Sequence, residues 1–245
     1  MVRDGVVTRE LEGGWLSARP GADAGDFPSM SLHRVYWLTP ASPLRAPHIA
    51  SAVDTVRGLG CRRAYLWLAP WAWDGESERL LNDAGAHPWP DLEYVALARA
   101  ATPFEPVRPT DLAVRVLSPA ETAGEFARVG AWYTPEGAAN AVRMAERGIA
   151  QAHGAFSGDT MIAVGLVTVV GAWAYLFAAG TDPAFRGRGA QTALIASRVR
   201  GAAEAGAAWC AVETNTAVPI SLRNLERCGF ARAVAWRVYQ WNDPA

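Results

Sequence analysis

Residues 180 to 194 read Gly180-Thr-Asp-Pro-Ala-Phe-Arg-Gly-Arg-Gly-Ala-Gln-Thr-Ala-Leu194, and they join an apolar strand pattern to a long helical one. Glycines let the backbone approach a ligand closely, and the first N–H groups of a helix have no acceptor within it. The helix macrodipole adds partial positive charge at that end. The pattern therefore predicts an anion site that suits a pyrophosphate. A loop that only caps a helix can look the same, because the dinucleotide fingerprint and the P-loop are both incomplete here.

The 19 residues before Thr181 carry no charged side chain. That length suits a membrane helix, but β-branched valines and interrupting glycines favour strands. We predict two buried strands, at 160–169 and 173–178, joined by a turn, and no membrane span.

The elements around the loop occur in an order that is found twice along the chain. Each copy reads strand, helix, strand, helix, strand, and Gly60 and Gly206 lie 146 residues apart at matching points. The offset predicts a duplicated fold, although this order also arises in unrelated proteins. The predicted elements are 34–38, 47–59, 63–69, 77–83 and 92–98 in the first copy, and 173–178, 189–205, 209–214, 220–227 and 231–241 in the second.

A proline-rich stretch separates the copies. Residues 101–110 contain three prolines, which is typical of a linker. We predict a first domain at 1–103 and a second at 107–245. Only the second has helical patterns before its repeated block, at 120–133 and 135–147, so the first copy is predicted to be truncated.

The loop of the first copy that corresponds to the anion loop has a different composition. It lies between residues 39 and 48, contains Pro40, Pro43 and Pro47, and has no glycine. Proline has no N–H to offer a phosphate. We therefore predict no cofactor in the first copy.

Composition excludes several classes of function. The 23 basic residues are all arginine, which removes chemistry that needs a lysine amine. A net charge of −1 argues against a nucleic-acid partner. Scattered cysteines and histidines lack metal-ligand spacing, so no metal is expected. The cysteine usage and the charged, non-apolar N-terminus favour the cytoplasm.

Two motifs resemble those of a known superfamily. Arg186-Gly-Arg-Gly-Ala-Gln191 is similar to the R/Q-x-x-G-x-G/A acyl-CoA motif of the GNAT superfamily of N-acetyltransferases, and Ser221 to Phe230 is similar to its second signature, a helix that ends in a Gly-Phe turn. Gln191 stands where glycine or alanine is usual, and because the contact there is mainly a backbone N–H, a side chain that points outward would be tolerated. The resemblance covers residues 111–241.

The resemblance implies a fold class and a co-substrate. The fold is α/β (α+β), with two GNAT-like copies that each have a mixed, mostly antiparallel central sheet flanked by helices, the N-terminal copy being truncated. The co-substrate is acetyl-CoA or another acyl-CoA, with no metal. The residues implied to bind it are Arg186, Gly187, Arg188, Gly189, Ala190, Gln191, Thr192 and Asn224.

The reaction of the superfamily is direct attack of an amine on a thioester, helped by a base and an acid. We predict Glu213 as the base, with Glu136 as second choice and a water relay as a further possibility. Leu225 occupies the place of the family's tyrosine. Ser221 is therefore predicted to protonate the leaving sulfur, unless it is only a helix cap or the thiolate leaves unaided.

The resemblance implies a function and an acceptor. We predict an N-acetyltransferase that transfers acetyl to a primary amine of a small molecule or peptide, as a monomer or homodimer. A non-catalytic acyl-CoA sensor or scaffold is the alternative. Four aromatic residues are expected either to line the acceptor cleft or to belong to the core: Trp132, Tyr133, Trp173 and Tyr175.

Overall fold

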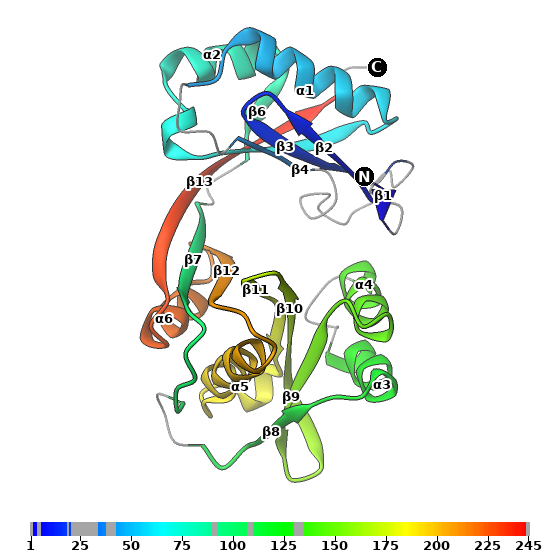
Figure 1. Ribbon diagram of the computed structural model, residues 1–245, viewed down its shortest axis with the longest axis vertical. Helices are drawn as coiled ribbons and strands as arrows, with labels where there is room; N and C mark the ends of the chain where they lie inside the picture. The colour runs from blue at the N-terminus through cyan, green and yellow to red at the C-terminus, as the bar shows by residue number, and fades with distance from the viewer. Residues whose placement is uncertain are drawn as a thin grey trace. The chain divides into compact units, whose positions relative to one another are not determined.

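The protein divides into two compact units. The structure, a computed structural model, describes residues 2–3, 6–18, 20, 34–37, 43–89, 93–106, 110–129 and 135–243 (Figure 1). Unit 1 comprises Met1–Val95 together with Val234–Ala245, and unit 2 comprises Ala96–Ala233. The chain therefore leaves unit 1, builds the whole of unit 2, and returns.

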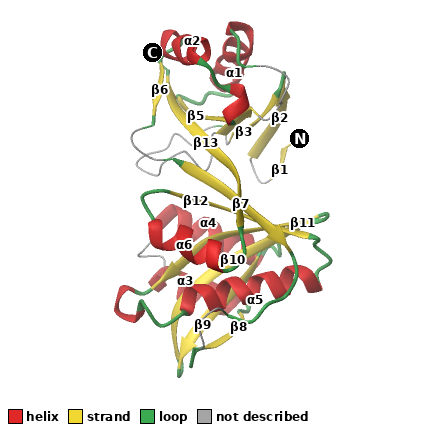
Figure 2. Ribbon diagram, turned by 90° about the vertical axis from the view of Figure 1, so that its left-hand side faces the viewer, coloured by secondary structure: helices red, strands yellow, loops and turns green. Residues whose placement is uncertain are grey.

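Unit 2 is a sheet with helices on both faces (Figure 2). Neighbouring strands are antiparallel except for the β11–β12 pair, which is parallel. The sheet follows the order β12-β11-β10-β9-β8, with β8 at Ala113–Val116, β9 at Gln151–Ser157, β10 at Thr160–Val170, β11 at Trp173–Thr181 and β12 at Trp209–Asn215. The helices are α3 (Pro119–Val129), α4 (Pro135–Glu146), α5 (Ala190–Glu204) and α6 (Pro219–Arg227).

The two faces of this sheet have separate cores. Met161 and Leu166 of β10 pack with Ala141 of α4, whereas Ile162 packs with Leu194 of α5. The uncharged stretch thus forms the two adjacent strands β10 and β11, as predicted. Among the described residues, no helix has the length and apolar character that a membrane crossing requires.

Unit 1 repeats part of this plan around its own core. Its strands are β1 (Val2–Arg3), β2 (Val6–Leu11), β3 (Gly14–Ala18), β4 (Arg34–Trp37), β5 (Arg63–Leu68) and β6 (Ala86–Pro88), and its helices are α1 (Ala46–Gly58) and α2 (Gly75–Asp83). The parallel pair β4–β5 corresponds to β11–β12, and α1 corresponds to α5. Within the described part of unit 1, no helix precedes β4.

The last strand of each copy lies beside the other copy's sheet. β13 (Ala231–Asn242) ends the second copy along the sequence, yet its residues from Arg237 to Asn242 pair with β5 of unit 1. β7 (Tyr94–Ala100) ends the first copy, and it neighbours β12 in the sheet order. The sequence pattern predicts 231–241 wholly in the second domain, whereas the structure places the part from Val234 onward in unit 1. Equivalent strands have the same pattern, so a repeat in sequence does not specify which sheet each strand joins.

Candidate functional site

The anion loop of unit 2 connects β11 to α5. A single 3-10 turn, Pro183–Phe185, follows β11, and α5 begins at Ala190. Gly187 and Gly189 have φ angles of 83° and 84°, a left-handed conformation that glycine adopts without steric cost. Gly189 is the N-cap of α5 and has no side chain to accept from the first helical N–H groups. These N–H groups and the helix dipole form a site that fits a pyrophosphate.

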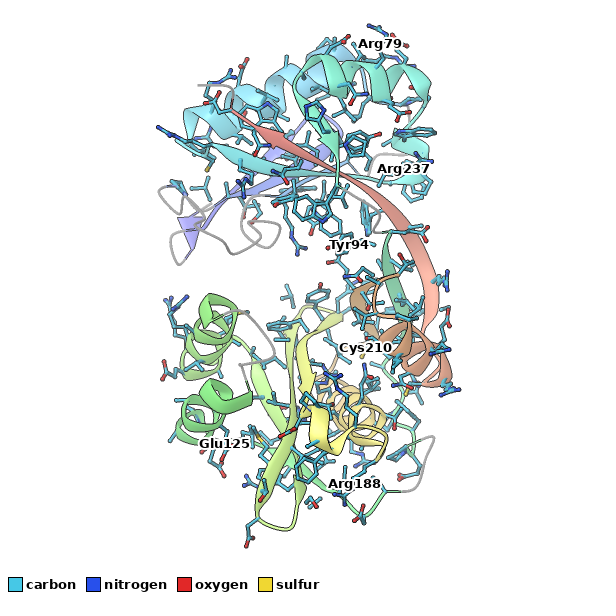
Figure 3. The ribbon with its side chains drawn as sticks, turned by 180° about the vertical axis from the view of Figure 1, so that it is seen from behind. Arg79, Tyr94, Glu125, Arg188, Cys210 and Arg237 are labelled. Carbon is cyan, nitrogen blue, oxygen red and sulfur yellow. The ribbon has the colours of Figure 1, made fainter. Side chains whose placement is uncertain are left out.

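Two of the residues predicted to bind the cofactor, Arg188 and Thr192, also form hydrogen bonds within the protein at this loop. The Arg188 guanidinium donates to Ser157 Oγ at 3.0 Å and to Asp111 Oδ2 at 2.7 Å. Thr192 Oγ1 donates to the Gly189 carbonyl oxygen at 2.9 Å. Both side chains therefore form contacts within the protein (Figure 3, Arg188). Arg186 is exposed, and within the described ranges no ion pair involves it.

The Gln191 side chain points toward α6. Its Nε2 donates to Ser221 Oγ at 3.1 Å, and its Oε1 accepts from Asn224 Nδ2 at 2.7 Å. This polar cluster joins the first turn of α5 to α6, because Ser221 and Asn224 lie three residues apart on one side of that helix. Ser221 is not a helix cap, since α6 begins at Pro219 with Val218 as its N-cap.

The parallel strands β11 and β12 separate halfway along their length. Their pairing runs from Trp173 with Trp209 to Leu176 with Val212, and the described residues of both strands continue beyond it unpaired with each other. β11 also contains a bulge on its other side, where the register with β10 shifts between Val164 and Leu166. Such a bulge redirects backbone groups out of the ladder. The opening and the bulge lie at the same level of the sheet.

Ala178 shows that the bulge is strained. Its φ is 47°, and it is the one non-glycine residue with positive φ in the described part of the chain. Strained backbone of this kind clusters at functional sites. The sequence does not predict the bulge, because alanine gives no signal for left-handed backbone.

Glu213 lies where the two strands part. It is the first residue of β12 after the last paired residue, Val212. Its Oε2 accepts a hydrogen bond from Tyr175 Oη of β11 at 2.9 Å. A half-buried carboxylate at this position is suited to accept a proton next to the opening.

A buried arginine lies beneath the bulge. Arg198 of α5 is 3% exposed and donates to the carbonyl oxygens of Leu166 at 3.2 Å, Phe177 at 3.4 Å and Leu194 at 3.2 Å. Gly165 makes room for it, because a Cβ there would lie 2.8 Å from the guanidinium carbon. The sequence does not predict the burial of this residue, since arginines are mostly exposed.

His153 belongs to a buried polar group next to Arg198. Its Nδ1 lies 2.9 Å from Ser197 Oγ and its Nε2 lies 3.0 Å from Gln151 Oε1. The amide oxygen can only accept, so Nε2 carries the proton and Nδ1 accepts from the serine. Burial, together with the positive charge of Arg198, lowers the pKa of His153 to about 4.

This histidine should make unit 2 less stable in acid. Between pH 6.5 and pH 4 the unfolded chain binds a proton on His153 that the folded protein does not, so stability is lost as pH falls through that range. We expect wild type to lose about 2 kcal/mol more than His153→Gln between pH 7 and pH 5. Urea unfolding at both pH values measures this, with His87→Gln, at an exposed histidine, as the control. Equal losses in wild type and His153→Gln would contradict the prediction.

The cysteines of unit 2 are poor nucleophiles. Burial raises the pKa of Cys210 and of Cys228 to about 11, despite the nearby positive charges of Arg99 and Arg198. Both thiols are therefore protonated at neutral pH and unsuited to carry an acyl group.

The remaining predicted residues divide into three groups. Leu225, at the place of the family's tyrosine, is 3% exposed and belongs to the core. Trp132, Tyr133 and the Glu136 side chain lie outside the described residues. Trp173 is 50% exposed, so it is not core. No group of metal-binding side chains occurs in the described ranges.

Comparison with known proteins identifies the fold. No family model matched the sequence, and no curated protein did. Among solved structures, a GCN5-related N-acetyltransferase from Kribbella flavida superposes with a TM-score of 0.66 at 16% identity, covering 98% of this chain and 90% of its own. A conserved protein of unknown function from Staphylococcus epidermidis gives a TM-score of 0.67 at 9% identity, covering 99% and 96%.

The chain therefore has the GNAT acetyltransferase fold, as the two sequence motifs predicted. It has this fold in its tandem form. A tandem GNAT protein from the clavulanic acid biosynthesis pathway covers 100% of this chain and 86% of its own, with a TM-score of 0.67 at 14% identity. The expected fold class, two GNAT-like copies with a mixed, mostly antiparallel sheet, is confirmed.

Proposed function

We propose that the protein is an acyl-CoA-dependent N-acyltransferase that transfers acetyl from acetyl-CoA to a primary amine of a small molecule or peptide. One observation carries the proposal: the anion loop, the strained bulge and the opening between β11 and β12 occur together on consecutive elements. A loop that only capped α5 would require neither the opening nor the bulge.

The backbone of the loop and the polar cluster on α6 would hold the co-substrate. The N–H groups from Arg188 to Gln191 face outward at the helix N-terminus and suit the pyrophosphate. Arg186 supplies an exposed positive charge beside them. Asn224, which donates a hydrogen bond to Gln191, would contact the pantetheine arm of the co-substrate.

The chemical step is a direct transfer. The amine nitrogen attacks the thioester carbonyl, the C–N bond forms, and Glu213 takes the proton that the nitrogen loses. The C–S bond then breaks, and the electron pair leaves with the sulfur. Ser221 Oγ accepts from Gln191, so its own proton can be donated to that sulfur, and water then returns a proton to the serine. A CoA thiol resembles a free cysteine in pKa, so unaided departure costs little.

Replacing Glu213 tests the base. We expect Glu213→Gln to lower kcat about 100-fold, a typical contribution of general base catalysis. Acetyl-CoA affinity should stay unchanged, because the residue lies away from the anion loop. Thiol release on a panel of primary amines measures the rate, and calorimetry measures the affinity. Glu226→Gln on the outer surface of α6, where Glu226 pairs with Arg232, is the matched control. A fall below threefold would favour a water relay.

A non-catalytic acyl-CoA sensor is the second candidate function. The observation that favours it is Leu225, a core residue at the place of the family's acid. A sensor would bind acetyl-CoA with the same affinity in wild type and Glu213→Gln, yet would release no thiol with any amine.

The proposal also covers the location, the assembly and the partners of the protein. We expect a cytoplasmic monomer or homodimer with a single acyl-CoA site per chain, in unit 2, and with neither nucleic acid nor membrane as partner. The start of α1 in unit 1 supports the expectation of a single site. Its first turn contains Pro47, which has no N–H, and the Arg45 N–H donates to His48 Nδ1 at 3.0 Å. Fewer N–H groups therefore remain there for a phosphate.

A further inference from the structure

One face of β11 and β12 carries a row of aromatic side chains that the proposed chemistry does not use. Alternate residues of a strand share a face, so Trp173, Tyr175 and Phe177 lie on one face of β11. Trp209 and Glu213 lie on the same face of β12, because Trp209 pairs with Trp173 in register. We name these four aromatic residues, together with Glu213, the aromatic strip. The opposite face is fully covered by the core, with Ala174 and Leu176 at most 1% exposed.

The far end of the aromatic strip is an exposed stacked pair. The rings of Trp173 and Trp209 are 5.9 Å apart at an interplanar angle of 25°, and they are 50% and 46% exposed. Val170, which pairs with Trp173 in the turn, is 73% exposed. Two large, ordered and exposed rings beside an exposed valine make an apolar patch of the kind that binds ligands.

The near end of the aromatic strip reaches the opening between the strands. Phe177 adjoins the bulge and packs on the core, and its ring stacks on Tyr175 at 5.9 Å and 16°. Glu213 lies at the level of Phe177 and accepts from the Tyr175 hydroxyl. A carboxylate next to aromatic faces is the usual recognition of an organic cation.

The spacing sets the length of the occupant. Four residues of strand separate the Trp pair from the level of Glu213, which corresponds to about 13 Å. Between them β12 contributes only Ala211, which pairs with Tyr175 and has a methyl group as its side chain. A ligand that uses both ends therefore has an amine at one end and an apolar group about 13 Å away.

We propose that the aromatic strip is the acceptor subsite, and that the acceptor is an elongated primary amine with an aromatic end. The amino group lies at Glu213 and the aromatic end lies on Trp173 and Trp209. This inference rests on the proposed function, whose amine it specifies. The other candidate occupant is a long acyl chain. Its apolar atoms would remove the charged Glu213 carboxylate from water, which costs free energy.

Two tetrapeptide amides test the subsite, since an extended peptide has the same rise per residue as the strand. Both begin with three glycines; one ends in phenylalanine and the other in alanine. We expect kcat/KM for thiol release to be about 10-fold higher with phenylalanine, the upper range of an aromatic contact. Trp173→Ala and Trp209→Ala should each reduce this preference below threefold. Trp15→Ala, at a tryptophan of unit 1 that is 48% exposed, is the matched control and should keep it.

The outcomes separate this inference from the proposed function. Equal rates for both peptides in wild type, or a preference that survives both tryptophan replacements, would overturn the subsite while transfer itself stands. Weaker binding of decanoyl-CoA relative to acetyl-CoA in the tryptophan variants, with the peptide preference intact, would assign the strip to the acyl chain instead. If acetyl-CoA binds but no thiol is released, catalysis fails. Calorimetric titration of the phenylalanine peptide into wild type and into Trp173→Ala then tests the subsite separately. The subsite stands only if wild type binds the peptide and Trp173→Ala does not.

Discussion

Gly189→Glu should abolish acetyl-CoA binding, with an affinity at least 100-fold below that of wild type. The substitution places a carboxylate at the N-terminus of α5, where the pyrophosphate is proposed to lie. Two negative groups would then compete for one set of N–H donors. The φ of 84° also disfavours any side chain at this position. Isothermal calorimetry measures the loss, and wild type should give one site per chain.

The control for this substitution is Gly206→Glu at the other end of the same helix. Gly206 follows α5 with a φ of 86° and has open space around it. It therefore brings the same charge and the same backbone strain without approaching the loop. Loss of binding in both variants would indicate general damage to α5, and unchanged affinity in Gly189→Glu would exclude the proposed phosphate site.

Ending the chain after Ala233 should unfold unit 1 and leave unit 2 folded. The deleted residues include the part of β13 that pairs with β5, from Arg237 with Leu68 to Asn242 with Arg63. They also remove Tyr239 and Trp241, which belong to the main core of unit 1. Losing two buried aromatic side chains costs roughly 6 to 10 kcal/mol, comparable to the whole stability of a domain.

Hydrogen exchange followed by mass spectrometry measures this effect separately in the two units. We expect β5 and α1 to lose protection in the shortened chain, while β10 and α5 keep it and acetyl-CoA still binds. A chain that starts at Val107 is the reverse case: it keeps Tyr239 and Trp241 but lacks β5, and it should be poorly soluble. Protected amides in β5 of the shortened chain would show that unit 1 does not need its last strand.

The local patterns of the sequence predicted most of the elements around the site. Valine-rich alternation predicted β10 and β11, and the glycines of the loop predicted the start of α5 to within one residue. These features are local, because strand propensity and helix termini depend on residues close in the chain. The fold class followed from the motif in this loop and from the second motif, at Ser221 to Phe230.

The features that shape the site depend on contacts far apart in sequence. The bulge at Ala178 arises where Gly165 faces it and Arg198 lies beneath, and none of these residue types signals such an arrangement by itself. The orientation of Gln191 was not predictable from its own segment, because its partners Ser221 and Asn224 lie on another helix. β7 and β13 each join the sheet of the other copy. This exchange leaves no local signature, because the two strands have equivalent sequence patterns.

The return of the chain to unit 1 has a consequence for the order of folding during synthesis. A ribosome makes residues 96–233 before it makes Val234–Ala245. The strand that pairs with β5 in the first sheet is therefore translated only after every residue of the second unit. Domains usually fold in the order in which they emerge, but here the unit that begins first must finish last. Until then, β5 is an unpaired edge that can pair with other chains, so a nascent or stalled polypeptide is the state in which this protein is most exposed to aggregation and most in need of a chaperone.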